Sequence, residues 1–196
     1  MTDHETLAAY ATRVEDYKDM VKAEPAGSLM AFADALPEGG RVLDFGCGPG
    51  HAAKYLAGRG FETHAWDASP EMIEAADAPG ISTRIAVFED LTSSAEYDGI
   101  YASFSLLHAP RADFAGHIAR IATALKPSGV LHLGLKTGTG EERDGIGRFY
   151  SYYSRDEIMA ALAANGMTAV WEHEGEEKGL AGTMAPFILV RATKNG

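Results

Sequence analysis

The stretch RVLDFGCGPGHAAKYLAGRG, residues 41–60, places three glycines at alternate positions, Gly46, Gly48 and Gly50, directly after an apolar run that predicts a buried strand. Glycine tolerates positive φ and has no side chain, so a ligand can approach the main chain of such a turn. The alternative is a tight strand–helix turn without a ligand, but three alternate glycines exceed what a turn alone requires. The stretch therefore predicts a ligand site where a strand leads into a helix.

Strand-like and helix-like segments alternate on the C-terminal side of this turn. Such alternation is typical of βαβ units and a mostly parallel sheet, and open sheets of this kind bind ligands at the carboxyl ends of their strands. Strands are predicted at 41–45, 62–67, 82–88, 98–103 and 129–135, with helices at 52–60, 69–76 and 113–126.

The two ends of the chain follow other patterns. Apolar residues three or four apart from Leu7 to Val21 predict an amphipathic N-terminal helix, and a second helix is predicted at 28–35. After the last parallel strand, 136–149 is predicted to be a long loop.

The C-terminal part continues with a helix predicted at 154–165, which begins with the capping-box sequence SRDE. Two strands, 167–174 and 183–192, are predicted to pair antiparallel at one sheet edge. We therefore predict a single α/β domain over 1–196. It is expected to be a Rossmann-like three-layer αβα sandwich with a mostly parallel seven-stranded sheet and an antiparallel C-terminal edge strand.

Composition excludes several classes of partner. The chain carries 28 acidic and 17 basic residues, a net charge of −11, which opposes the phosphate contacts that drive nucleic-acid binding. No apolar run is long enough to span a membrane, and no signal peptide opens the sequence, so a cytoplasmic location is expected. A single cysteine argues against disulfides and most zinc sites, and no metal is predicted.

The acidic residue before the glycines narrows the choice of ligand. Gly48, Gly50 and Ala53 match the dinucleotide-binding pattern, with Asp67 about 20 residues further on. Asp44, however, directly precedes the glycine-rich turn, where a carboxylate would repel a pyrophosphate and favour a cationic amine. The P-loop pattern is absent from the sequence.

The stretch VLDFGCGPG (42–50) resembles motif I of the class I S-adenosylmethionine-dependent methyltransferases, hydrophobic-hydrophobic-[DE]-x-G-x-G-x-G. The resemblance extends to residue 135 through AWDASPEMI, VFEDL, YDGIYASFSLLHAP and LKPSGVLHLGL. Two positions depart from the family pattern. The usual Gly-Asp pair is missing from VFEDL, and Ser128 replaces a glycine in LKPSG.

The resemblance implies S-adenosyl-L-methionine as cofactor and S-adenosyl-L-homocysteine as product. It assigns Asp67 to the ribose hydroxyls, Asp44 to the methionine end through the amine or an ordered water, and the segment 88–90 to the adenine. Met72 either flanks the adenosine or packs in the core. The residues assigned to cofactor binding are Asp44, Phe45, Gly46, Cys47, Gly48, Gly50, Asp67, Ala68, Met72, Phe88, Glu89, Asp90 and Ser103.

The family chemistry is an in-line methyl transfer in which positioning does most of the work, and a base is needed only if the acceptor loses a proton. His108 is the candidate to deprotonate or orient an acceptor; alternatively it caps a helix beginning near Arg111. Residues 1–36 would form a lid, 37–135 the cofactor-binding core and 136–196 the acceptor side. The acceptor-side candidates, each of which core packing would also explain, are Tyr10, Tyr17, Arg148, Tyr150 and Tyr152.

A small-molecule acceptor is predicted. SFSL (103–106) stands where methyltransferases acting on nucleobase amines carry an Asn/Asp-Pro-Pro-aromatic loop, and no large insertion is present for docking a protein or RNA. A nicotinamide-dependent reductase is the first alternative, although no tyrosine has a lysine four residues on. A non-catalytic S-adenosylmethionine-binding protein stays open, because this chemistry requires no invariant catalytic side chain. The sequence does not indicate an oligomeric state.

Overall fold

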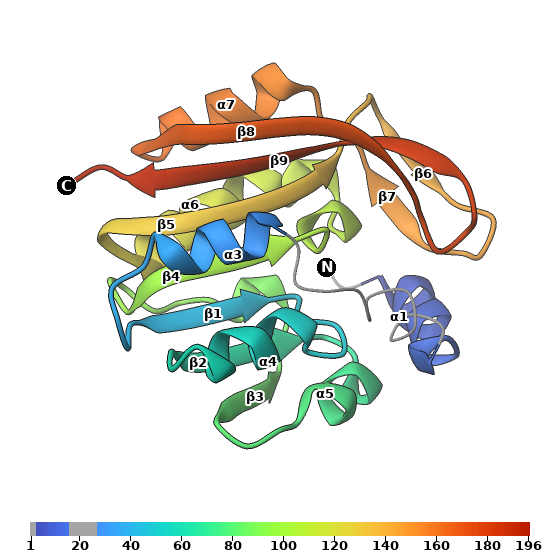
Figure 1. The fold of residues 1–196 in the computed structure, drawn as a ribbon. Helices are drawn as coiled ribbons and strands as arrows, with labels where there is room; N and C mark the ends of the chain where they lie inside the picture. Colours follow the sequence, from blue (N-terminus) through green and yellow to red (C-terminus); the bar gives the residue numbers. More distant parts are fainter. Residues whose placement is uncertain (1–2, 16–26) are drawn as a thin grey trace.

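A seven-stranded sheet forms the centre of the fold, with its strands in the order β3-β2-β1-β4-β5-β9-β8 (Figure 1). The structure is a computed structural model that describes residues 3–15 and 27–196. The strands of the sheet are β1 (Arg41–Phe45), β2 (Glu62–Asp67), β3 (Ile81–Ile85), β4 (Tyr97–Ser103), β5 (Leu125–Lys136), β8 (Met167–Lys178) and β9 (Met184–Lys194).

The first five strands are parallel, and β9 runs antiparallel to both β5 and β8. The predicted fold class is therefore confirmed. Within the antiparallel pair, β8 is the outermost strand and β9 lies between it and β5. The strand order reverses between β1 and β4, which places a topological switch point, the usual ligand position in such sheets, at their carboxyl ends.

Helices cover both faces of the sheet. Alternate residues of a strand face opposite sides, so Val42 of β1 packs with Phe32 and Leu56 on one face, while Leu43 packs with the Ile118 cluster on the other. The first face carries α3 (Gly27–Asp34), α4 (His51–Gly58) and α5 (Pro70–Ala76), and the second carries α6 (Phe114–Ala124) and α7 (Arg155–Ala164).

Two small elements lie beyond the carboxyl ends of the parallel strands (Figure 1). Helix α1 (His4–Ala11) is the described part of the predicted N-terminal helix; Tyr17 and Val21 lie outside the described residues. Strands β6 (Glu141–Arg143) and β7 (Phe149–Ser151) form an antiparallel hairpin. The prediction of a long loop over 136–149 was therefore wrong. All three residues of β6 are charged and exposed, so no apolar alternation marks the strand.

The strand predicted at 82–88 is shorter at its carboxyl end, since β3 ends at Ile85. Residues Phe88–Asp90 form a single 3₁₀ turn instead. Among the described residues, no helix is both long and apolar enough to cross a membrane.

Candidate active site

The glycine-rich turn between β1 and α4 is fixed by backbone geometry and by close packing. Gly46 has φ of 80°, and a Cβ built on it would lie 2.2 Å from the Cβ of Ser105. Gly50 has φ of 76°, and its Cβ would lie 2.7 Å from that of Ala76. Both positions require glycine through positive φ and the closeness of neighbouring elements. The turn thus lets α4 and α5 approach the sheet and leaves the main chain bare at its carboxyl edge.

Asp44, near the end of β1, is only 3% exposed. Its Oδ2 accepts a hydrogen bond of 2.9 Å from the backbone N–H of Ala53, in the first turn of α4. Burial, reinforced by the nearby charge of Asp67, raises the pKa of the Asp44 carboxyl to about 7. Asp44 therefore holds the turn against the start of α4 through this bond. In the described part of the chain its buried carboxyl group has no cationic side-chain partner.

Asp67, the last residue of β2, faces the same turn from the neighbouring strand. Its Oδ2 accepts the N–H of Gly48 and its Oδ1 the N–H of Ser69, each at 2.9 Å. Burial raises the pKa of this carboxyl as well. Each carboxylate oxygen has more than one acceptor site, so the two backbone donors fix the group and leave capacity to bind hydroxyls of a ligand.

A first cavity, with a volume of about 120 Å³, opens beside Asp67. Its walls come from α1, the glycine-rich turn, the ends of β2 and β4, and the 3₁₀ turn that follows β3. The sequence-predicted residues that line it are Tyr10, Phe45, Gly46, Gly48, Asp67, Ala68, Met72, Phe88, Glu89, Ser103 and His108.

A second cavity, of about 490 Å³, lies on the side of the β6–β7 hairpin and the β8–β9 turn. Tyr10, Gly46, Ser103, Phe104 and His108 line both cavities, so the two are adjacent. The sequence-predicted residues that line the second cavity are Tyr10, Asp44, Gly46, Cys47, Ser103, His108, Arg148 and Tyr150.

The remaining predicted site residues lie elsewhere. Gly50 caps α4. The carboxylate of Asp90 accepts the N–H of Val87 within its own turn, and the hydroxyl of Tyr152 donates to Glu142. Gly50, Asp90 and Tyr152 are not among the described residues that line the two cavities.

His108 joins α1 to the β6–β7 hairpin. Its Nδ1 lies 2.6 Å from the carbonyl oxygen of Phe149, which can only accept, so Nδ1 carries the proton and donates. Nε2 is then the acceptor for the Tyr10 hydroxyl at 2.8 Å. Burial lowers the pKa of the imidazole to about 4, so the ring is neutral at pH 7. The alternative in which His108 caps the helix near Arg111 was wrong, since both ring nitrogens are engaged elsewhere.

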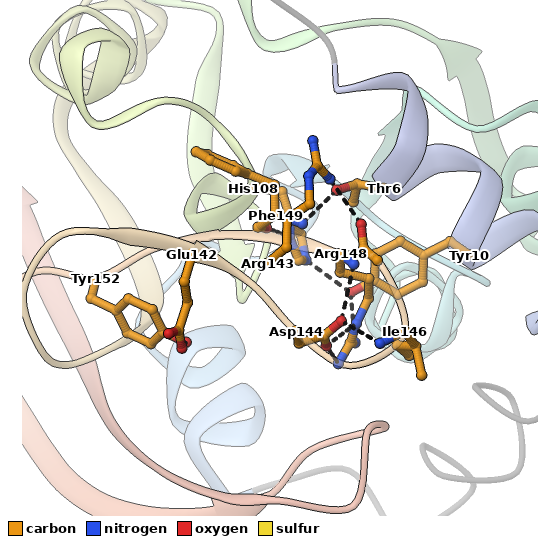
Figure 2. Close-up of polar contacts among 11 residues, drawn as sticks. Thr6, Tyr10, His108, Glu142, Arg143, Asp144, Ile146, Arg148, Phe149 and Tyr152 are labelled. Carbon is orange, nitrogen blue, oxygen red and sulfur yellow. Dashed lines mark hydrogen bonds and ion pairs between the residues drawn. The ribbon is translucent and has the colours of Figure 1, made fainter.

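Arg148 lies beside this pair and carries its own counterion (Figure 2). Its Nε and Nη2 donate to Asp144 Oδ2 at 2.9 and 2.7 Å, and its Nη1 donates to the Tyr10 hydroxyl at 3.1 Å. Arg148, an acceptor-side candidate from the sequence, is thus already paired with a carboxylate. Its guanidinium instead helps to hold Tyr10 between the two cavities.

Two residues that sequence reasoning did not select also line the cavities. His117 of α6 lines the first cavity, is 3% exposed, and has no hydrogen-bond partner on either ring nitrogen among the described residues. Its ligand atoms lie within 4.8 Å of those of Glu89 and Asp113. The sequence did offer one signal for His117: it is a histidine within the apolar stripe of the helix that forms α6. Lys136, at the end of β5, lines the second cavity.

Comparison with known proteins gives partial matches to curated relatives. Trans-aconitate 2-methyltransferase of Mycobacterium tuberculosis is 39% identical over 72 residues, 36% of this chain and 28% of the relative. Ubiquinone biosynthesis O-methyltransferase of Xylella fastidiosa is 38% identical over 101 residues, 47% of this chain and 40% of the relative. The matched parts span well under half of these relatives.

Solved structures match over most of the chain. A Burkholderia thailandensis 1,6-didemethyltoxoflavin-N1-methyltransferase, solved with 1,6-didemethyltoxoflavin and S-adenosylhomocysteine, has a TM-score of 0.76 at 20% identity, covering 98% of this chain and 88% of that one. A methyltransferase from Methanosarcina mazei has a TM-score of 0.75 at 17% identity, covering 88% and 99%. At these identities the likeness shows a shared fold.

A family model described as a methyltransferase domain matches residues 17–172, well over half of the chain. The match confirms the predicted methyltransferase family. The chain therefore belongs to the methyltransferase-domain family, within the class I S-adenosylmethionine-dependent methyltransferases that its sequence resembles.

Proposed function

We propose that the protein transfers the methyl group of S-adenosyl-L-methionine to a small molecule bound in the second cavity. The observation that carries the proposal is the adjacency of the two cavities at the switch point of the sheet. The first contains the Asp67 carboxylate, the second is bounded by the hairpin, and Tyr10, Ser103 and His108 line both. This arrangement suits a cofactor in the first cavity whose reactive end faces an acceptor in the second.

The chemistry of the lining residues fits this cofactor. The fixed Asp67 carboxylate, in the first cavity, is suited to accept two ribose hydroxyls. The buried acid Asp44 lines the adjoining second cavity and is suited to a cationic amine where the methionine end of the cofactor reaches that cavity. Met72 and Phe88 supply apolar walls for an adenine ring. Glu89 and His117 supply polar atoms at the same end of the cavity.

The protein's part in the reaction is mainly to position the reactants. When bound, the cofactor supplies a methyl group on a positively charged sulfur, and the leaving thioether is neutral. Little charge therefore has to be stabilised, and holding the acceptor in line contributes most of the rate. We assign His108 to hold the Tyr10 hydroxyl between the cavities, because its Nε2 already accepts from that hydroxyl and its low pKa makes it a weak base.

The cofactor assignment is tested with Asp67→Ala. Losing two charge-assisted hydrogen bonds is expected to weaken S-adenosylhomocysteine binding by about tenfold or more, as measured by isothermal titration calorimetry. The matched control is Asp77→Asn, an exposed carboxylate at the end of α5, which we expect to bind as the wild type does. If Asp67→Ala keeps wild-type affinity while remaining folded by circular dichroism, Asp67 is not the ribose ligand.

Methyl transfer itself is tested by following S-adenosylhomocysteine formation from deuterium-labelled S-adenosylmethionine as small-molecule fractions are added. Binding without turnover in every fraction would favour the non-catalytic alternative. The lack of a nucleic-acid partner, the cytoplasmic location and the division into 1–36, 37–135 and 136–196 stay predictions.

A further inference from the structure

Lys136, a residue that is largely buried, places its ammonium group in the wall of the second cavity. It is the last residue of β5 and is 8% exposed. Its Nζ lies 4.6 Å from the centroid of the Tyr150 ring on β7, and a Cβ built on Gly179, in the β8–β9 turn, would lie 3.3 Å from it. Three parts of the fold therefore enclose this side chain beside the cavity.

The ammonium of Lys136 has no direct anionic partner. None of the hydrogen bonds and ion pairs among the described residues involves its Nζ. Burial, followed by the charge of Arg148, lowers its pKa, while the more distant carboxylates of Glu177, Asp144 and Glu142 act in the opposite direction. A charged group that is partly withdrawn from water and lacks a bonded counterion is unfavourable. An anion entering the cavity would relieve that cost.

The other charged residues at this cavity do not offer the same opportunity. Arg148 is committed to Asp144 and Tyr10, and the side chain of Lys178 is exposed to solvent. Glu177 is half-buried and carries a negative charge. Among the described residues of the second cavity, Lys136 is thus the buried cation that lacks a bonded counterion.

We propose that Lys136 binds a carboxylate of the methyl acceptor in the second cavity, an inference that rests on the proposed function. A single ammonium matches the single charge of a carboxylate. The Tyr150 ring against which the ammonium lies adds a cation–π contact that holds the lysine in place.

The test titrates protein saturated with S-adenosylhomocysteine with mono-, di- and tricarboxylates, including benzoate, citrate and trans-aconitate, each paired with its neutral methyl ester. At least one carboxylate is expected to bind at least tenfold more tightly than its ester. Lys136→Met is expected to abolish that preference, again by a factor of ten or more. Lys126→Met, which removes the same charge near the start of β5 from a residue that lines neither cavity, is expected to change the affinity less than threefold.

The remaining outcomes of the titration contradict either the role proposed for Lys136 or the proposed function. If no carboxylate in the panel is preferred to its ester, or if Lys136→Met retains the preference, the proposal is wrong. A loss of S-adenosylhomocysteine affinity in Lys136→Met without acceptor assigns the lysine to the cofactor instead. Failure of the wild-type protein to bind S-adenosylhomocysteine would contradict the proposed function itself.

Thermal unfolding separates a binding defect from a folding defect. Because Lys136→Met removes an unpaired buried charge and keeps the side-chain length, its melting temperature without ligand is expected to equal or exceed that of the wild type. Should the methionine variant fail to fold, Lys136→Gln takes its place in the same titration, with the same tenfold loss expected.

Discussion

At the scale of single residues, Asp44 shows how one carboxyl group affects both stability and binding. Its pKa is about 7 in the folded chain, against an ordinary value of 3.8. A carboxyl whose pKa is raised by folding stabilises the folded state fully below the ordinary value, and that contribution is lost as the pH rises through 7. The folded protein therefore carries a cost at pH 8 that is absent near pH 4.

Asp44→Asn is expected to remove this cost and still accept the N–H of Ala53. The free energy of unfolding should rise by up to about 4 kcal/mol at pH 8 and by progressively less toward pH 4, measured by urea denaturation across this range. S-adenosylhomocysteine should bind more weakly to the variant, because the amine of the cofactor loses an anionic partner. A gain of equal size at all pH values would contradict the assignment of the pKa to Asp44.

The same residues show what a sequence can and cannot reveal about a site. Asp44 was identifiable from its place before the alternate glycines, because that spacing reflects a turn that few other sites use. Asp67 was identifiable from the family motif that AWDASPEMI resembles. Their bonds to the N–H groups of Ala53 and Gly48 depend on how the turn closes in three dimensions. Lys136 gave no signal, since a lysine at the end of an apolar strand is normally solvated.

At the scale of elements, α1 is held in place mainly by the β6–β7 hairpin. Asp3 forms an ion pair with Arg143 at 2.7 Å, and Thr6 Oγ accepts the N–H of Phe149 at 2.8 Å. The bond between Arg143 and Asp3 holds the pKa of that carboxyl down, at about 2. Thr6 is buried, whereas the ion pair is partly exposed and contributes little. The threonine contact is therefore expected to dominate the docking of α1.

Thr6→Val keeps the shape of the side chain and leaves the N–H of Phe149 without its acceptor. Loss of this partly buried bond, worth about 1–3 kcal/mol, together with the bond that the Thr6 hydroxyl donates to Asp3, is expected to speed amide hydrogen exchange in α1 with little change in the protection of β1 and β4. Mass spectrometry of exchanged peptides measures this. Thr123→Val, whose hydroxyl is exposed and bonds within its own helix, should leave α1 unchanged. Equal exchange in Thr6→Val and the wild type would contradict the docking role.

Elements with strong local signals were predicted closely, and those without were missed. The strands 41–45 and 62–67 match β1 and β2 at both ends, and Ser154 caps α7 as the predicted capping box requires. The helix predicted at 69–76 is α5, which Ser69 caps. These signals lie in apolar periodicity and capping residues. The β6–β7 hairpin is stabilised by contacts with α1 and the loop around His108, which no local pattern encodes.

At the scale of the whole molecule, the net charge of −11 is partly concentrated on the outer strand of the sheet. β8 leaves one row of backbone groups without a neighbouring strand, and it carries the exposed carboxylates Glu172, Glu174 and Glu176. Charges on an edge strand discourage pairing with another copy of the chain. The acidic composition thus acts on association as well as on the choice of ligand.

The double variant Glu174→Val and Glu176→Val is expected to associate as its concentration rises, because it makes the edge of β8 apolar and less charged. Size-exclusion chromatography with light scattering measures the mass. The control, Glu74→Leu with Asp77→Leu, removes the same charge from the exposed surface at α5 and should keep the wild-type mass. Wild-type behaviour of the β8 variant would show that these carboxylates do not guard the edge.

The sharing of Tyr10 between the two cavities has a thermodynamic consequence. Its hydroxyl is bonded on one side to His108 and on the other to Arg148 of the hairpin, so a molecule on either side acts on the same three groups. Affinities linked in this way must be reciprocal: whatever factor the acceptor adds to retention of the cofactor product, the product adds to retention of the acceptor. A substitution at Tyr10, His108 or Arg148 that alters this coupling is therefore expected to alter it by the same factor in both affinities.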